Sequence, residues 1–139
     1  MDQLDFHKNS STPPPRTSLP IIQRLISVYK LWYEYLPHFH KTSRYTLGKK
    51  IDFLFIEAAE LMFIAGHLEK SQKLPYVQKA IGKLDTLKFF LQISWEIQML
   101  DNKKYIVLSK PLDEIGRMLG GWLRQLQLKP NPIKNGAGK

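Results

Sequence analysis

The 139-residue chain is 43% hydrophobic, a length and composition that suit one globular domain with a buried core. It contains no cysteine, which excludes disulfides, zinc–thiolate sites, thiol catalysis and iron–sulfur clusters. Its 21 lysines and arginines against 12 acidic residues give a net charge of +9, which favours nucleic acid, an anionic surface or an acidic protein as partner, although solvated lysine-rich faces are also common.

The N-terminal residues 1–17 are predicted to form a disordered arm, because they hold three consecutive prolines and a serine/threonine cluster. They contain two aspartates and no basic region followed by an apolar run, so we expect no signal peptide. The apolar stretch from Ile51 to Gly66 is interrupted by three acidic residues and is a poor candidate for a membrane span. We expect a cytoplasmic protein.

Four helices are predicted between residues 18 and 128, because apolar residues recur there at spacings of three and four. Their predicted bounds are Ser18 to Pro37, Arg44 to Glu69, Pro75 to Leu100 and Lys103 to Leu126. The apolar stripes that define them are Ile21, Leu25, Val28 and Trp32; Ile51, Leu54, Phe55, Ala58, Leu61, Met62, Ala65 and Leu68; Val77, Ile81, Leu84, Leu87, Leu91, Ser94 and Trp95; and Leu108, Leu112, Ile115, Leu119, Trp122 and Leu126.

The helices are predicted to form an all-α, up-down antiparallel four-helix bundle over residues 18–128, because the connections at 71–73 and 101–103 are short. Pro111 lies inside the fourth helix, where it removes one hydrogen bond. We expect a kinked continuous helix, and a new start near Ser109 is the alternative. Residues 129–139 contain two prolines and two glycines and are predicted to be a disordered tail.

The third predicted helix carries a second apolar face in addition to its core stripe. This face is formed by Phe90, Ile93, Ile97 and Leu100. A helix of a small monomeric bundle needs only one such stripe, and large exposed apolar patches usually mark interfaces. We therefore predict a homo-oligomer; the alternative is a broad core with aromatic edges.

Basic residues form rows at helical spacing, and these are the candidate nucleic-acid and partner-binding residues. Lys103, Lys110, Arg117 and Arg124 recur every seven residues, so on a continuous helix they follow one side, roughly opposite the core. No acidic residue belongs to this row. The remaining candidates are Lys79 and Lys83, four apart on the third helix, and Lys49 and Lys50 on the second. Phosphate contacts add in number, although each row is also compatible with a solvated face.

No arrangement of residues supports catalysis or metal binding. Of the four histidines, His7, His38, His40 and His67, two form a His-x-His pair, but a zinc site needs three or four ligands. The chain has no glycine-rich phosphate loop, no Gly-x-Ser-x-Gly motif and no kinase motif set. We expect no enzyme activity, no metal and no cofactor.

Two adjacent glycines, Gly120 and Gly121, lie inside the fourth predicted helix between Leu119 and Trp122 of its apolar stripe. Each glycine costs about 1 kcal/mol relative to alanine inside a helix, so a pair there needs a structural reason. We predict that they allow a neighbouring helix to pack closely and leave room for the indole of Trp122, while Arg117 and Arg124 project from the other side.

Three segments in the same order resemble the accessory variability determinant (Avd) family of diversity-generating retroelements. They are RYTLGKKI at 44–51, LDTLKFFLQISWEI at 84–97 and DNKKYIVLSKPLDEIGRMLGGW at 101–122, which contains the most specific motif, EIGRMLGGW. The resemblance implies a basic homopentameric barrel that binds the retroelement reverse transcriptase and template RNA, with DNA as a further candidate. It also implies a non-catalytic role in mutagenic cDNA synthesis and retrohoming.

A second group of four-helix proteins, encoded in intervening sequences of 23S ribosomal RNA genes, is similar around Gly48 and the two adjacent glycines. That group tends to carry an arginine where this chain has Gln92, a difference that favours the retroelement family. The alternative function is therefore a structural bundle that binds ribosomal RNA or an unknown partner.

Overall fold

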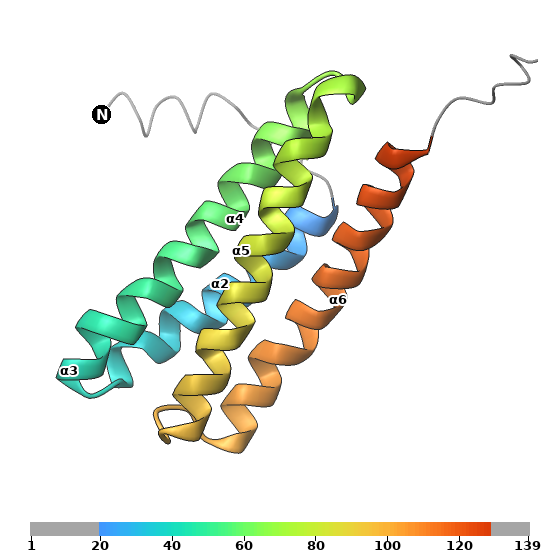
Figure 1. The fold of residues 1–139 in the computed structure, drawn as a ribbon. Coiled ribbons are helices and arrows are strands. Elements are labelled where there is room, and N and C mark those ends of the chain that lie inside the picture. Colours follow the sequence, from blue (N-terminus) through green and yellow to red (C-terminus); the bar gives the residue numbers. More distant parts are fainter. Residues whose placement is uncertain (1–19, 129–139) are drawn as a thin grey trace, which may run out of the picture.

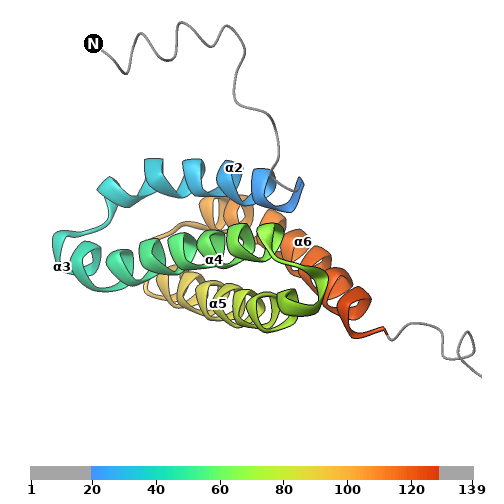
Figure 2. The same cartoon turned by 90° about the horizontal axis from the view of Figure 1, so that it is seen from above.

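The computed structural model describes residues 20–128, and all regular structure within that range is helical (Figure 1). The four long helices are α2 (Pro20–Tyr35), α4 (Lys49–His67), α5 (Lys70–Glu96) and α6 (Asn102–Gln127). They form a ring in which α2 packs on α4 and α6, while α5 lies between α4 and α6 (Figures 1 and 2). Consecutive long helices run in opposite directions, so the predicted up-down four-helix bundle is confirmed. The predicted arm and tail lie outside the described residues.

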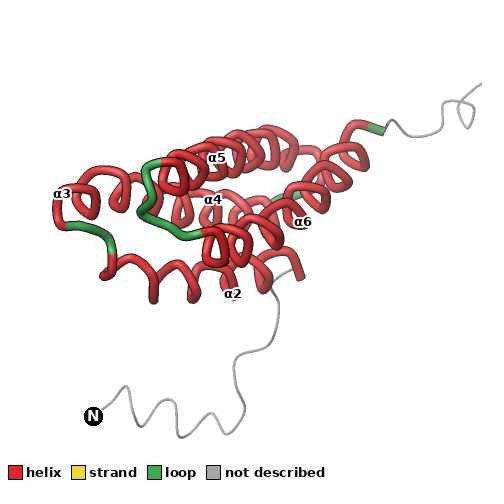
Figure 3. Tube along the Cα trace, turned by 90° about the horizontal axis from the view of Figure 1, so that it is seen from below, coloured by secondary structure: helices red, strands yellow, loops and turns green. Residues whose placement is uncertain are grey.

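Three short helical segments connect α2 to α4: η1 (Leu36–His38), α3 (Lys41–Ser43) and the π-helical η2 (Arg44–Gly48). The guanidinium of Arg44 donates hydrogen bonds to the carbonyls of Pro37 and Phe39, at 3.1 and 3.2 Å. Gly48 is buried, and a Cβ atom there would lie 2.6 Å from Leu36 Cδ1. The RYTLGKKI segment therefore builds the corner that turns the chain from α2 into α4 (Figure 3).

Helix α5 begins five residues earlier than predicted, so the predicted connection at 71–73 is wrong. The actual connection is Leu68 and Glu69, and the Gln72 amide donates to the Glu69 carbonyl at 2.8 Å to close the first turn. Pro75 lies inside the helix rather than at its start, where its missing N–H removes one hydrogen bond.

Helix α5 also ends four residues earlier than predicted, at Glu96. The backbone of Gln98 has a φ of 67°, the left-handed conformation that commonly follows a helix C-terminus. The amides of Met99 and Leu100 then donate to the Ser94 carbonyl at 2.8 and 3.2 Å. This turn reverses the chain and directs Leu100 back into the core, where it is 1% exposed.

Helix α6 runs unbroken from Asn102 to Gln127 through Pro111, which confirms the continuous helix and contradicts a new start near Ser109. Its N-cap is Asp101, whose side chain accepts a hydrogen bond of 2.8 Å from the Lys104 amide.

The core is built from the predicted stripes, with two kinds of exception. All four predicted residues of α2 and most of those on α4, α5 and α6 are buried. Leu61, Leu68, Ile81, Trp122 and Leu126 are only half-buried, and Trp95, at 38% exposed, is not a core residue. Phe39 joins the core from the α2–α4 connection. Each large apolar side chain buried here contributes about 1.5–3 kcal/mol.

A polar contact fixes α2 against α4 at the edge of this core. The Tyr29 hydroxyl and the Trp32 indole N–H both donate to Asp52 Oδ1, at 2.8 and 3.1 Å. Burial, and secondarily the hydrogen bond to the Asp52 carboxylate, raises the pKa of Tyr29 to about 12. No helix among residues 20–128 has the length and apolar character needed to cross a membrane.

Candidate nucleic-acid and partner interface

The basic row of Lys103, Lys110, Arg117 and Arg124 lies along the solvent-exposed side of α6, as predicted. The buried residues of the helix, from Leu108 to Leu119, occupy the opposite side. Within residues 20–128, none of the four cations has a carboxylate oxygen within 4.0 Å. We call these four residues the α6 basic row.

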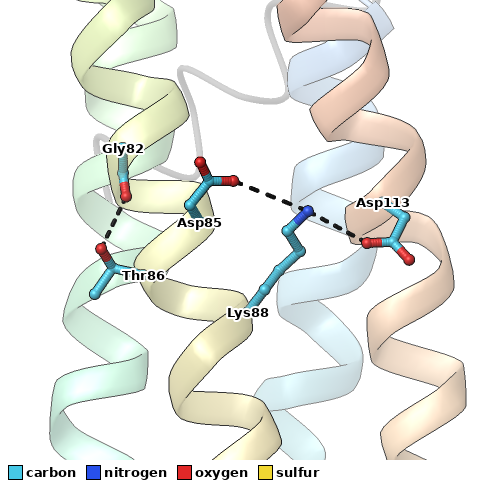
Figure 4. A network of polar contacts seen from close by, with 5 residues as sticks. All are labelled: Gly82, Asp85, Thr86, Lys88 and Asp113. Carbon is cyan, nitrogen blue, oxygen red and sulfur yellow. Dashed lines mark hydrogen bonds and ion pairs between the residues drawn. The ribbon is translucent and has the colours of Figure 1, made fainter.

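The two acidic residues within α6, Asp113 and Glu114, are paired with cations of neighbouring helices. Asp113 accepts from Lys88 of α5 at 3.3 Å, and Lys88 also lies 4.0 Å from Asp85 (Figure 4). On the other flank, Glu114 accepts from Arg24 of α2 at 2.7 Å. The two carboxylates therefore hold α6 to its neighbours instead of neutralising the row.

The other candidate lysines do not join this row. Lys83 on α5 pairs with Glu57 of α4 at 3.2 Å, so it lies on the α4 side of α5. Lys79 is exposed, with its Nζ 6.0 Å from the ring centroid of Tyr76. Lys49 and Lys50 are exposed at the start of α4, which follows directly from η2 and is not a free helix end. The structure thus places the candidate cations in separate groups on different helices.

The prediction that Gly120 and Gly121 pack closely against a neighbouring helix is wrong for this chain. A Cβ atom at Gly120 would meet nothing within 4 Å, and at Gly121 only the Arg124 guanidinium at 4.0 Å. At about 100° per residue, both positions lie closer to Arg117 than to the core stripe. The two glycines therefore belong to the exposed side of α6, between Arg117 and Arg124, where they leave the helix backbone bare.

Trp122 is half-buried at the end of the bundle where α2 begins. Its ring lies 5.9 Å from Nζ of Lys73, which also donates to the Ala65 carbonyl at 2.6 Å. Trp122 and Lys73 line an apolar pocket of about 390 Å³ together with Pro20, Ile21, Gly66 and Met118. The room around the indole therefore comes from the ends of four helices, not from the neighbouring glycines.

Two groups of exposed apolar side chains bear on assembly, one of which sequence patterning did not identify. The predicted second face of α5 is present in part: Ile97 is 48% exposed, Phe90 and Ile93 are half-buried, but Leu100 belongs to the core. A larger set lies on α2 and α4: Ile26, Tyr33, Phe53, Ile56 and Phe63, each 40–65% exposed. We call these five residues the α2–α4 apolar face.

The described histidines are His38, His40 and His67. Among residues 20–128, no group of three or more potential metal ligands is found, and His7 lies outside that range. His67 instead contacts the Phe63 carbonyl through Nδ1 at 2.9 Å.

A comparison with protein families matches residues 19–126 to the bAvd-like family. The chain belongs to the bAvd-like family. The match covers the four long helices and the corner between α2 and α4, and so extends beyond the segments that carry the sequence resemblance. Comparison with curated proteins and with solved structures finds no match.

Membership of the bAvd-like family places the protein among accessory, non-catalytic proteins of the Avd type. The structure gives the family-like motifs physical roles. RYTLGKKI supplies Arg44 and Gly48, which shape the α2–α4 corner, and EIGRMLGGW supplies both an ion-paired carboxylate and an arginine of the α6 basic row. Sequence patterning missed Arg44 because its partners are backbone carbonyls, which leave no trace in side-chain periodicity.

Proposed function

We propose that this bAvd-like protein is the accessory protein of a diversity-generating retroelement. It binds the reverse transcriptase and the template RNA through basic surfaces and thereby supports mutagenic cDNA synthesis and retrohoming. The α6 basic row is the surface that contacts RNA phosphates. The protein itself supplies no catalytic group.

The observation that carries this proposal is the segregation of charge on α6. Four exposed cations, spaced by about 10 Å along a helix of 1.5 Å rise per residue, face solvent, while the adjacent Asp113 and Glu114 are bound to α5 and α2. An ordinary solvated helix face mixes both signs of charge. A row of cations beside acids that are already paired instead favours binding to a polyanion such as RNA. Each contact between a cation and a phosphate releases counterions from the RNA.

The test is a charge reversal of the row with a matched control. In the variant Arg117→Glu/Arg124→Glu, two cations of the row become acids. The control, Lys30→Glu/Lys41→Glu, makes the same change of net charge at exposed positions on α2 and α3. Binding of the retroelement template RNA is measured over a range of salt concentrations. We expect the row variant to bind more weakly and to lose about one unit of salt slope per lost contact, while the control changes little.

Equal losses in the two variants would mean that only the total charge matters and would contradict the assignment of the row. Co-purification with the reverse transcriptase tests the second half of the proposal. Retention of a stoichiometric reverse transcriptase by the wild-type protein is expected, and its absence would contradict it.

A homopentamer is part of the proposal. It is supported by the α2–α4 apolar face, because exposed apolar side chains in this number usually mark an interface. Native mass spectrometry of the full chain measures the number of protomers directly. A monomer at micromolar concentration would contradict the proposal.

The alternative function, a structural bundle of the 23S ribosomal RNA intervening-sequence type, predicts a different partner. Affinity purification from the host separates the two. Ribosomal RNA without a reverse transcriptase supports the alternative, whereas a reverse transcriptase with a specific non-coding RNA supports the accessory function.

A further inference from the structure

An aromatic pair lies beside the turn between α5 and α6, formed by the exposed Trp95 of α5 and the half-buried Tyr105 of α6. Trp95 stacks on Tyr105, with ring centroids 5.4 Å apart and an interplanar angle of 21°. The indole N–H of Trp95 donates a hydrogen bond of 2.6 Å to Asn102 Oδ1, which fixes the orientation of the ring. Trp95 nevertheless remains 38% exposed, so part of its aromatic surface is available to a ligand.

Trp95 forms a wall of an open pocket at this turn, at the lower end of the bundle in Figure 1. The pocket has a volume of about 840 Å³ and is lined by Trp95, Glu96, Gln98, Leu100, Asp101 and Asn102. Its size is in the range of small-molecule sites. The carboxylates of Glu96 and Asp101 accept hydrogen bonds and repel phosphate, so the pocket suits a planar group that carries N–H donors.

Gln98 lies in the turn that ends α5, next to Ile97. Its φ of 67° is a left-handed conformation that glycine adopts without strain and most other residues adopt at a cost in conformational energy. Gln98 is also one of the residues that line the pocket.

The α6 basic row begins at the same turn of the chain as this pocket. Lys103, its first cation, is the next residue after the pocket residue Asn102. From there the row extends for about 30 Å along α6, at 1.5 Å per residue. A nucleic-acid strand whose phosphates follow the row would therefore bring one end to Trp95.

Building on the proposed RNA-binding function, we propose that Trp95 and its pocket bind an unpaired nucleobase of single-stranded RNA. The base stacks on the exposed part of the Trp95 ring, and its N–H groups donate to Glu96 or Asp101. Base–aromatic stacking of this kind tolerates any sequence, because every base has a π-face. A base inside a duplex is already stacked and paired, so the pocket discriminates single strands from duplexes.

The experiment uses the full chain and a short single-stranded RNA that carries one 2-aminopurine, whose fluorescence is quenched by stacking. The variants are Trp95→Ala, Trp95→Phe, which keeps an aromatic ring but loses the indole hydrogen bond, and Phe89→Ala, which removes an exposed aromatic side chain elsewhere on α5. Circular dichroism verifies that each variant is folded. The same oligonucleotide in a duplex provides the reference ligand.

We expect Trp95→Ala to weaken single-strand binding by about fivefold or more, the lower end of the effect of removing one stacking aromatic. The 2-aminopurine quenching should be lost, while duplex affinity and the salt slope should be unchanged. Trp95→Phe and Phe89→Ala should bind nearly as wild type.

The inference would be overturned if Trp95→Ala and the wild type showed the same single-strand affinity and the same quenching. That result would leave the proposal for the α6 basic row intact. A wild-type protein that binds no RNA would overturn both proposals. If Trp95→Ala loses RNA binding and Arg117→Glu/Arg124→Glu does not, the result would support base binding at Trp95. It would also contradict the proposal that the α6 basic row contacts RNA.

Discussion

Gly48 and Gly120 are both helical glycines, but they differ in what surrounds them. Gly48 is buried, with Leu36 Cδ1 2.6 Å from the position of its missing Cβ, whereas Gly120 faces open space. We expect Gly120→Ala to raise the free energy of unfolding by about 1 kcal/mol, because alanine is the better helix former. Gly48→Leu should lower it by about 1–3 kcal/mol through overpacking. Urea unfolding followed by circular dichroism measures both changes.

The two substitutions serve as controls for each other, because both add a side chain to a helix of the same protein. If Gly120→Ala lowers the free energy of unfolding, a partner molecule or a second copy of the chain must pack against the helix backbone at Gly120. An unchanged free energy of unfolding in Gly48→Leu would contradict the importance of close packing at the α2–α4 corner.

Burial of Tyr29, together with its hydrogen bond to Asp52, makes the stability depend on pH in alkali. The folded-state pKa of Tyr29 is about 12, against an ordinary value of 10.0. Below pH 10 the tyrosine is protonated in both states, and its contribution to stability is complete. Between pH 10 and about 12 the unfolded chain loses this proton first, so the free energy of unfolding falls.

The measurement compares urea unfolding of the wild type and Tyr29→Phe at about pH 9 and about pH 11. All other titratable groups are common to the two proteins, so the difference between them isolates the contribution of Tyr29. We expect the wild type to lose more stability than Tyr29→Phe over this interval. Parallel losses would mean that burial and the hydrogen bond to Asp52 do not raise the pKa of Tyr29.

The residues that sequence patterning placed correctly are those whose role depends on helical period alone. Ile21, Leu25, Val28 and Trp32 are buried because four apolar residues on one side of a helix must face a core. The same geometry places Gly120 and Gly121 about 60° and 40° from Arg117, away from the core stripe, so the helical period argues against close packing of a neighbouring core helix there. The pairing of Asp113 and Glu114 was not predictable, since it depends on which helices lie on either side of α6.

Helix α6 combines an outer row of cations with two acids that connect it to the neighbouring helices. The pairs Arg24–Glu114 and Lys88–Asp113 are exposed, so each contributes only about 0.2–1 kcal/mol to stability. In the variant Asp113→Asn/Glu114→Gln, both acids are removed and both partner cations are released. We expect nearly unchanged stability and a severalfold higher affinity for the template RNA at low salt, a gain that shrinks as salt screens the charges.

The matched control for this variant is Glu34→Gln/Glu60→Gln, which removes the same number of charges from exposed positions on α2 and α4. Affinity is measured by filter binding at several salt concentrations, and stability by urea unfolding. An equal gain of RNA affinity in the control would show that affinity depends on the net charge alone and not on charges near α6.

Helix boundaries were predictable where a residue stops a helix and not where tertiary contacts extend it. Pro37 follows the end of α2 closely, as expected from its fixed backbone. Pro75 was interpreted as a helix start, but the Gln72 amide bonds to the Glu69 carbonyl and begins α5 a turn earlier. The continuous α6 was correctly predicted despite Pro111, because the apolar stripe keeps its phase on both sides of the proline.

The bundle carries exposed cations on one side and exposed apolar side chains on another. The α6 basic row faces outward from one helix, and the α2–α4 apolar face covers a side formed by two others. A second copy of the chain that covers the apolar face would leave the basic row exposed. Assembly and RNA binding can therefore coexist, and repeated rows on several protomers would increase the number of phosphate contacts.

This division of surfaces predicts that assembly and the fold of the protomer can be separated by mutation. Phe53 and Phe63 are 55% and 56% exposed on α4, so Phe53→Ser/Phe63→Ser removes little from the core of a single chain. Burial of each phenylalanine between copies would contribute about 1.5–3 kcal/mol, enough for the double variant to weaken an oligomer strongly. We expect native mass spectrometry to show mainly monomers, with an unchanged helical circular dichroism spectrum.

Phe89→Ser, at an equally exposed position on α5, is the control and should leave the oligomer intact. The opposite result, with dissociation only in Phe89→Ser, would move the interface to the outer side of α5.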